Sequence, residues 1–182
     1  LRPAWKEKIG VVMTSGNSSD EPICTGNDEA LTRLRGLADF FLLHNREIVT
    51  RVDDSVARVM GGRPRLLRRA RGYSPVPILL RRPTQDILAC GAEMKNSFCL
   101  VRRGEAYLSQ HIGELTGPES LDFFQESITH LQSVLEVAPP QVACDLHPDY
   151  LSSRHARALG LPCTGVQHHH AHVGAVLAEL GL

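Results

Sequence analysis

The sequence has few aromatic residues, no closely paired cysteines and no long apolar run. Aromatic side chains make up 5% of the 182 residues, which argues against the stacked aromatic platforms that bind single-stranded nucleic acid. No stretch reaches the roughly 18 uninterrupted apolar residues of a membrane span, and the start, LRPAWKEKIG, lacks the apolar core of a signal peptide. These absences predict a cytoplasmic protein that does not act at a membrane.

The cysteines are odd in number and widely spaced, with no Cys-x-x-Cys pair. Such a pattern does not indicate a disulfide framework or a thiolate metal site. Each cysteine lies in an apolar or mixed segment, so buried free thiols are the expected state. The five positions are Cys24, Cys90, Cys99, Cys144 and Cys163.

Charge is balanced overall but unevenly distributed. Residues 1–82 carry 15 Lys and Arg against 9 Asp and Glu, whereas residues 83–182 carry 5 against 11. This asymmetry predicts two units with a boundary near residue 80, the first suited to an anionic ligand such as a nucleotide, a phosphate ester or nucleic acid. Because the chain opens with Leu1 and ends at Leu182 inside a helical pattern, we expect it to be a fragment of a longer protein.

The first unit reads as α plus β. An apolar, β-branched run predicts a buried strand at 8–14, and apolar spacing predicts a helix of about ten residues after Gly26. Gly61-Gly62 tolerates positive φ and predicts a tight hairpin. The remaining predicted strands are 40–49, 55–60 and 63–72.

The second unit reads as α/β after an extended connection. Three prolines between residues 73 and 83 disfavour regular strand pairing. Three short strands are predicted within 86–111, and Gly117-Pro118 opens a helix that extends to about Val137. A strand, helix, strand, helix order over 141–180 then favours a largely parallel sheet.

A histidine cluster follows the last predicted strand, in Val166-Gln167-His168-His169-His170-Ala171-His172. In a helix, His168 and His172 lie one turn apart on one face and can reach the same metal ion. Two imidazoles do not select a metal and are too few for a closed site. The alternative is a helix start with exposed histidines.

Two features of the first unit favour phosphate. Thr14-Ser15-Gly16-Asn17 follows a predicted strand and offers backbone amides and small polar groups. Arginines can hold phosphates by bidentate contacts or bind an RNA backbone, and a solvated basic face is the alternative. Those between residues 58 and 71 are Arg58, Arg63, Arg65, Arg68, Arg69 and Arg71.

The second unit has two further polar segments beside strands. The turn CGAEMKNS offers Gly91, Lys95 and Asn96 to an anion. CDLHPDY places Asp145 and His147 at the carboxyl end of a predicted parallel strand, where open α/β sheets bind ligands.

Seven segments, in order, resemble the HypF family of hydrogenase maturation carbamoyltransferases: VVMTSGNSSDEPI, RVDDSV, RRARGYSPVPI, CGAEMKNSFCL, LSQHIGEL, DLHPDYLSS and VQHHHAH. The resemblance runs from about Val11 to the end and covers only the middle of the family's chain. It implies part of an α+β YrdC-like domain over residues 1–72 and a linker over 73–85. Residues 86–182 would be part of an α/β ribonuclease H-like, actin-like ATPase domain related to threonylcarbamoyltransferases.

The resemblance also implies a two-step activity. Carbamoyl phosphate and ATP would give carbamoyl-adenylate in the YrdC-like domain, and the second domain would pass the carbamoyl group to the C-terminal cysteine of the partner HypE. The product would supply cyanide ligands to the iron of [NiFe]-hydrogenases. Because both sites would be incomplete, we expect little complete turnover from these residues alone.

The resemblance assigns roles to individual residues. It places Ser15 and Asn17 at the ATP phosphates or their Mg²⁺, within the loop that begins at Thr14. His168 and His172 would hold a divalent transition metal, zinc or iron, with an aspartate ligand beyond the end of the chain. Asp54, Ser55, Arg69 and Arg71 would lie near the adenylate, and Gly91, Lys95 and Asn96 at a second nucleotide site.

The chain departs from the family pattern at two positions, and two other functions remain open. Glu114 stands where the family's HIGDL motif has aspartate, and Met94 stands where leucine is expected. The basic first unit also fits a YrdC-like RNA-binding module. A third interpretation keeps the fold but makes tRNA threonylcarbamoylation the reaction.

Overall fold

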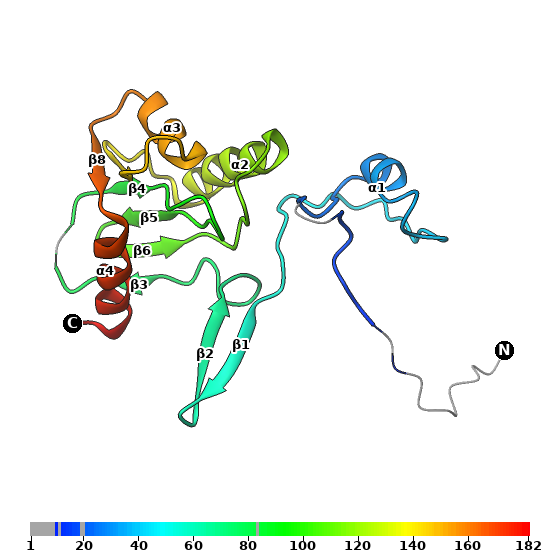
Figure 1. The fold of residues 1–182 in the computed structure, drawn as a ribbon, viewed down its shortest axis with the longest axis horizontal. Helices are drawn as coiled ribbons and strands as arrows, with labels where there is room; N and C mark the ends of the chain where they lie inside the picture. Colours follow the sequence, from blue (N-terminus) through cyan, green and yellow to red (C-terminus); the bar gives the residue numbers. More distant parts are fainter. Residues whose placement is uncertain (1–9, 11, 19–20, 83) are drawn as a thin grey trace.

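The computed structural model describes the chain except residues 1–9, 11, 19–20 and 83. Figure 1 shows a β-hairpin and a six-stranded sheet with helices, and a segment carrying α1 that lies apart from the sheet. The helices are α1 (Asn27–Arg33), α2 (Pro118–Leu135), α3 (Leu151–Ala158) and α4 (His168–Leu180). The strands are β1 (Val56–Met60), β2 (Arg63–Arg68), β3 (Ile78–Leu79), β4 (Ile87–Ala89), β5 (Cys99–Arg102), β6 (Glu105–Leu108), β7 (Val142–Asp145) and β8 (Cys163–Val166).

The hairpin β1–β2 confirms the prediction made from its glycines. Gly61 and Gly62 have φ of +59° and +73°, and Met60 pairs with Arg63 across the turn. Positive φ at both central residues matches the twist of the two strands. β2 ends at Arg68, four residues before the predicted end.

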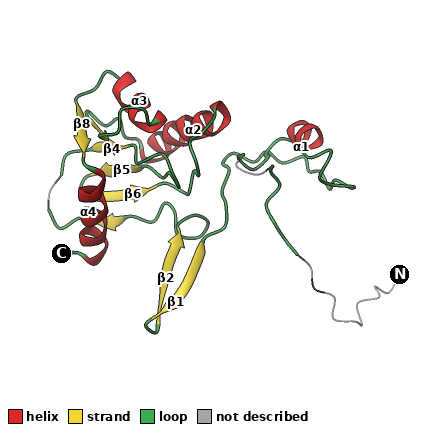
Figure 2. Cartoon of the chain, viewed as in Figure 1, coloured by secondary structure: helices red, strands yellow, loops and turns green. Residues whose placement is uncertain are grey.

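The large sheet has the order β3-β6-β5-β4-β7-β8 (Figure 2). β4, β7 and β8 run parallel, which confirms the predicted strand and helix alternation at the end of the chain. β3, β6, β5 and β4 pair antiparallel. Of these, β5 and β6 are joined by the tight turn Arg103-Gly104, which can connect only antiparallel neighbours. The sheet is therefore mixed rather than largely parallel.

The core lies between this sheet and α2. Gly117 is the N-cap of α2 and Pro118 its first residue, as predicted. Phe124 is fully buried and meets the Phe98 ring edge-on at 5.9 Å, a favoured aromatic geometry. The other buried members are Leu88, Cys90, Leu100, Ile112, Leu115, Phe123, Ile128, Leu131, Leu135, Val142, Cys144 and Ala156.

Some predicted elements differ from the structure. Residues 40–49 form no strand, and most of their side chains are exposed, because an apolar run pairs only where another strand lies beside it. Helix α1 has seven residues, fewer than expected. Of the strand predicted at 8–14, residues 10 and 12–14 belong to no strand. Residues 8, 9 and 11 lie outside the described residues.

The segment predicted as an extended connection contributes a short strand. Ile78 and Leu79 pair with Ala106 and Glu105 at the edge of the sheet. They lie between the second and third prolines of the segment, and edge positions tolerate proline nearby. Among the residues that the structure describes, no helix is both long and apolar enough to cross a membrane.

Candidate functional site

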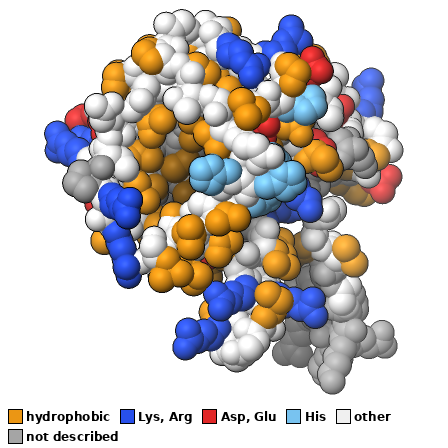
Figure 3. All heavy atoms as spheres, turned by 60° about the vertical axis from the view of Figure 1, so that its left-hand side comes forward, with side chains coloured by type: hydrophobic (Ala, Val, Ile, Leu, Met, Phe, Trp, Pro, Cys, Tyr) orange, Lys and Arg blue, Asp and Glu red, His pale blue; other side chains and the backbone are white. Residues whose placement is uncertain are grey.

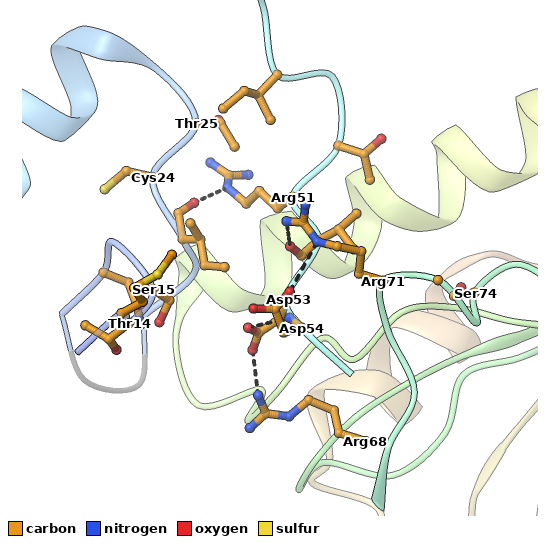
Figure 4. A pocket seen from close by; sticks show the side chains of 17 residues that line it. Thr14, Ser15, Cys24, Thr25, Arg51, Asp53, Asp54, Arg68, Arg71 and Ser74 are labelled. Atoms are coloured by element: carbon orange, nitrogen blue, oxygen red, sulfur yellow. Dashed lines mark hydrogen bonds and ion pairs between the residues drawn. The ribbon is translucent and has the colours of Figure 1, made fainter. Parts of the chain in front are cut away.

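A cavity lies between the loop after residue 12 and the segment 50–54. Its volume is about 1010 Å³, at the upper end of what ligand pockets usually measure. Polar and charged side chains reach it from both segments and from β2 (Figure 4). The polar and charged lining residues are Thr14, Ser15, Asn17, Cys24, Thr25, Thr50, Arg51, Asp53, Asp54, Arg68, Arg71 and Ser74.

Ion pairs and a hydrogen bond involve the arginines of this cavity. Arg68 Nη1 lies 2.8 Å from Asp53 Oδ2, and Arg71 Nε lies 3.3 Å from Asp54 Oδ1. Arg51 Nε donates to the Ile23 carbonyl at 3.0 Å. Guanidinium groups bind phosphates and carboxylates bind Mg²⁺, so the cavity has the groups needed for a metal-bound polyphosphate.

Five predicted residues line this cavity: Thr14, Ser15, Asn17, Asp54 and Arg71. The structure thus brings together positions up to 57 residues apart in the sequence. Asn17 Nδ2 donates to the carbonyls of Ser18 and Glu21, each at 2.9 Å, which fixes the loop that carries Ser15.

Two predicted residues do not line the cavity. The Ser55 hydroxyl donates to the Arg71 carbonyl and accepts from the Ala70 amide, both at 2.9 Å. Arg69 Nη2 donates to the Val76 carbonyl at 2.8 Å. Ser55 therefore positions the backbone beside the cavity, and contact of either residue with an adenylate stays a prediction.

Arg68 lines the cavity too, as one of the arginines that the sequence analysis offered to phosphates. The sequence prediction gave no individual role to Arg51, Asp53 and Cys24. Arg51 and Asp53 belong to the RVDDSV segment that carries the family resemblance, so the sequence held a signal for both, whereas Cys24 had none. Burial raises the pKa of the Cys24 thiol, although the nearby Arg33 charge opposes that rise, so this thiol is protonated at neutral pH.

A second site lies at the carboxyl ends of the three parallel strands. Gly91 follows β4, Asp145 ends β7, and His168 follows β8, and these strands are neighbours. The Ser152 hydroxyl of α3 donates to the Gly91 carbonyl at 3.0 Å, and the Ser153 hydroxyl donates to the Asp145 carbonyl at 2.9 Å. Helix α3 therefore holds two of the three strand ends together.

The predicted nucleotide loop at this edge has a rigid backbone. Gly91 has φ of +67°, and a Cβ there would lie 2.2 Å from the Ser97 carbonyl oxygen. Asn96 is buried and its Nδ2 donates to the carbonyls of Cys90 and Ala92. Lys95 is exposed on the same loop with φ of +49°. Asn96 thus closes the loop, while Lys95 is the accessible charge.

The histidine pair has the geometry expected from its spacing, and pale-blue histidine side chains gather on the exposed face drawn in Figure 3. His168 Nε2 and His172 Nε2 are 3.1 Å apart, within the range of about 3.0 to 3.4 Å for two nitrogens that share one metal at about 2.1 Å. His169 lies instead beside Gln167, with its Nδ1 2.9 Å from the amide nitrogen. The described residues contain no group of three possible metal ligands.

Asp145 contacts one histidine of this pair. Its Oδ2 lies 2.7 Å from His168 Nδ1, and its Oδ1 accepts the His147 amide at 2.8 Å. Burial raises the pKa of Asp145, but the hydrogen bonds from the His147 amide and the His168 ring together lower it by more. The net pKa therefore lies below its ordinary value. Asp145 is therefore an ionised acceptor at neutral pH.

His111, in the segment after β6, contacts the basic segment of the first unit. Its amide donates to the Arg69 carbonyl at 3.0 Å. Burial lowers the pKa of this imidazole, and the Arg68 charge lowers it further. His111 is therefore neutral at pH 7 and connects the basic segment to the sheet without adding charge.

Comparison with known proteins gives a family match for both parts of the chain. Residues 82–179 match the family model described as "HypF Kae1-like domain", and residues 4–70 match the model described as "Telomere recombination", of the Sua5, YciO and YrdC proteins. The chain belongs to the HypF family. The HypF-family relatives include "Carbamoyltransferase HypF2" of Cupriavidus necator, 50% identical over 98% of this chain, and "Carbamoyltransferase HypF" of Synechocystis, 48% identical over 97%.

Two HypF crystal structures superpose well on this chain. Full-length HypF in the phosphate- and nucleotide-bound form matches 93% of the chain with a TM-score of 0.89 and 47% identity, and the chain covers 27% of it. HypF of T. kodakarensis matches 93% with a TM-score of 0.86 and 40% identity, and the chain covers 23% of it. The chain spans about a quarter of the length of the relatives it matches, 23% for each of the two carbamoyltransferases.

Proposed function

We propose that this chain is part of an ATP-dependent carbamoyltransferase of [NiFe]-hydrogenase maturation. It would act in the formation of carbamoyl-adenylate and in transfer of the carbamoyl group to the C-terminal cysteine of HypE. The observation that carries this proposal is the cavity in which Ser15, Asn17, Asp54 and Arg71 converge, in a chain of the HypF family. Cytoplasmic localisation is part of the same proposal.

In the first step, the residues of the cavity would bind and orient ATP. Arg68 and Arg71 would neutralise the charge that develops as pyrophosphate leaves the α-phosphorus. Ser15 and Asn17 would contact the phosphates or Mg²⁺, and Asp53 and Asp54 supply carboxylates for that ion. Water would first release inorganic phosphate from carbamoyl phosphate, and an oxygen of the resulting carbamate would then form the new bond to the α-phosphorus as the bond to pyrophosphate breaks.

In the second step, the parallel strand ends would bind the activated group. The strand order β3-β6-β5-β4-β7-β8 supports the ribonuclease H-like, actin-like interpretation of residues 86–182. Lys95, beside Gly91 and Asn96, would contact nucleotide phosphates. His168 and His172 would hold zinc or iron, which when bound supplies Lewis-acid polarisation of a carbonyl. HypE would approach this edge as the thiol acceptor.

The first test is carbamoyl-phosphate-dependent exchange between ATP and pyrophosphate. In the native full-length protein, changing Ser15 and Asn17 together to Ala is expected to lower the exchange rate by a factor of about 10² or more, because phosphate contacts in the transition state are lost. Ser18→Ala is the matched control, since Ser18 is the adjacent serine and does not line the cavity. A folded parent protein that binds ATP but shows no exchange would contradict the adenylation step.

The hairpin favours RNA contact as a second candidate. Arg58, Arg63 and Arg65 are exposed on β1 and β2, where they can meet a phosphate backbone. Duplex RNA binding that weakens steeply with salt and is unaffected by ATP would support an RNA-binding module. Threonylcarbamoylation of tRNA, in place of carbamoyl transfer to HypE, would support the third interpretation.

A further inference from the structure

Asp145 is held by two hydrogen bonds that use different carboxylate oxygens. Its side chain is 10% exposed, and it stands at the last position of β7, opposite Val166 of β8. Oδ1 accepts the backbone amide of His147 at 2.8 Å, and Oδ2 faces His168 Nδ1 at 2.7 Å. The backbone bond fixes which oxygen is free for the imidazole.

An ionised carboxylate only accepts hydrogen bonds, so the contact requires a proton on His168 Nδ1. A neutral imidazole with its proton on Nδ1 has its lone pair on Nε2. Nε2 is the atom that lies 3.1 Å from His172 Nε2. The carboxylate thereby directs the metal-binding lone pair of His168 toward the second histidine.

We propose that Asp145 is a positioning residue, which holds His168 in the Nδ1-protonated tautomer so that both Nε2 atoms face one divalent cation. This inference rests on the proposed function, because it assumes that His168 and His172 bind the metal. Carboxylate partners of this kind orient metal-binding histidines and increase their basicity.

Simple capping of α4 does not explain the position of Asp145. The N-cap of α4 is Gln167, whose side-chain oxygen accepts the His170 amide at 3.1 Å. Both oxygens of Asp145 are instead used by His147 and His168. The acidic side chain therefore acts on the imidazole rather than on the helix backbone.

The deciding variant is Asp145→Asn in the metal-free, full-length protein. The His147 amide still requires an acceptor, which leaves the asparagine NH₂ facing His168 Nδ1. A donor there favours the opposite tautomer and places a proton on Nε2. We expect Co²⁺ to bind about 10 to 100 times more weakly, measured by visible absorption in competition with a chelator.

Asp149→Asn is the matched control, because it removes the same charge from an exposed position nearby. Asp149→Asn is expected to keep Co²⁺ affinity within about twofold, as is normal for an exposed surface charge. In a His168→Ala background, Asp145→Asn should have no further effect, since coupled residues do not add. Equal Co²⁺ affinity of Asp145→Asn and the parent would overturn the proposal.

Two further results distinguish the hypothesis of a metal site at His168 and His172 from the hypothesis that Asp145 positions His168. If His168→Ala and His172→Ala bind Co²⁺ as the parent does, the assignment of the metal site to these two histidines is wrong. If they lose Co²⁺ and Asp145→Asn does not, only the role of Asp145 is wrong. Should Asp145→Asn fail to fold, ¹⁵N shifts of labelled histidine in the parent decide: a proton on His168 Nε2 in the metal-free protein would contradict the proposal.

Discussion

At the scale of single residues, backbone geometry restricts the nucleotide loop most strongly at Gly91. Its positive φ of +67° is unfavourable for any side chain, and a Cβ would lie 2.2 Å from the Ser97 carbonyl. The loop can accept another residue there only by moving the backbone beside β4. Such a shift would also move the Gly91 carbonyl that accepts the Ser152 hydroxyl.

Gly91→Ala is therefore expected to destabilise the protein by about 2 to 4 kcal/mol, from strain and overpacking together. Gly160→Ala is the control, because Gly160 has a similar φ of +69° but a Cβ added there would meet no atom within 4 Å. Gly160→Ala should lower the free energy of unfolding by about 1 kcal/mol. Urea unfolding measures the stability of both variants, and equal losses of stability would show that the Ser97 contact does not matter.

The cysteines also differ one by one. All five are free thiols, as the sequence predicted. Cys90 and Cys144 are buried and Cys163 is exposed. The expected burial is therefore confirmed for only some of the five cysteines. Burial raises the pKa of Cys90 to about 12, which makes it a packing residue. β8 ends the described sheet, and this edge position leaves Cys163 accessible.

At the scale of elements, α1 depends on one carboxylate. Glu29 Oε2 accepts the amides of Thr25 and Gly26 at 2.9 and 3.2 Å, and the side chain pairs with Arg33. Burial raises the pKa of Glu29, but the two amides and Arg33 lower it to a net value below 4.5. The short helix has no buried residue, so these bonds are its main support.

Glu29→Gln should therefore destabilise the α1 segment at pH 7 and less so in acid. A folded pKa below the unfolded value adds stability above about pH 4.5, which is lost as pH falls through the folded pKa. The difference in stability between the parent and Glu29→Gln should shrink below that pH. Hydrogen exchange of residues 25–34 measures this difference. Glu47→Gln, at an exposed loop position, is the control. A difference independent of pH would contradict the role of the carboxylate.

At the scale of the whole molecule, Arg51 links the cavity to the sheet. Its guanidinium lies 5.6 Å from the Phe123 ring of α2 and bonds to the Ile23 carbonyl. Its own carbonyl accepts Gln110 Nε2 at 3.0 Å. One residue therefore contacts the loop around the cavity, the main helix and the segment after β6.

Arg51→Ala should loosen the cavity while leaving the sheet intact. We expect faster hydrogen exchange in residues 21–26 and 50–54, and unchanged exchange in β5, because the core contacts of β5 do not involve Arg51. Loss of the half-exposed pair with Glu126 contributes at most about 1 kcal/mol. Arg46→Ala, in an exposed loop, is the control. Uniform acceleration across the chain would show that Arg51 supports the whole fold.

Features that depend on local geometry could be predicted from the amino-acid sequence. The Gly61-Gly62 hairpin, the first turn of α2 and the shared face of His168 and His172 follow from allowed dihedrals and the helical repeat. Only the three-dimensional arrangement of the chain determines which of the arginines reach the cavity, why residues 40–49 form no strand, and that Asp145 meets His168. Those features depend on contacts between segments far apart in the sequence and on which strands become neighbours, which no local pattern encodes.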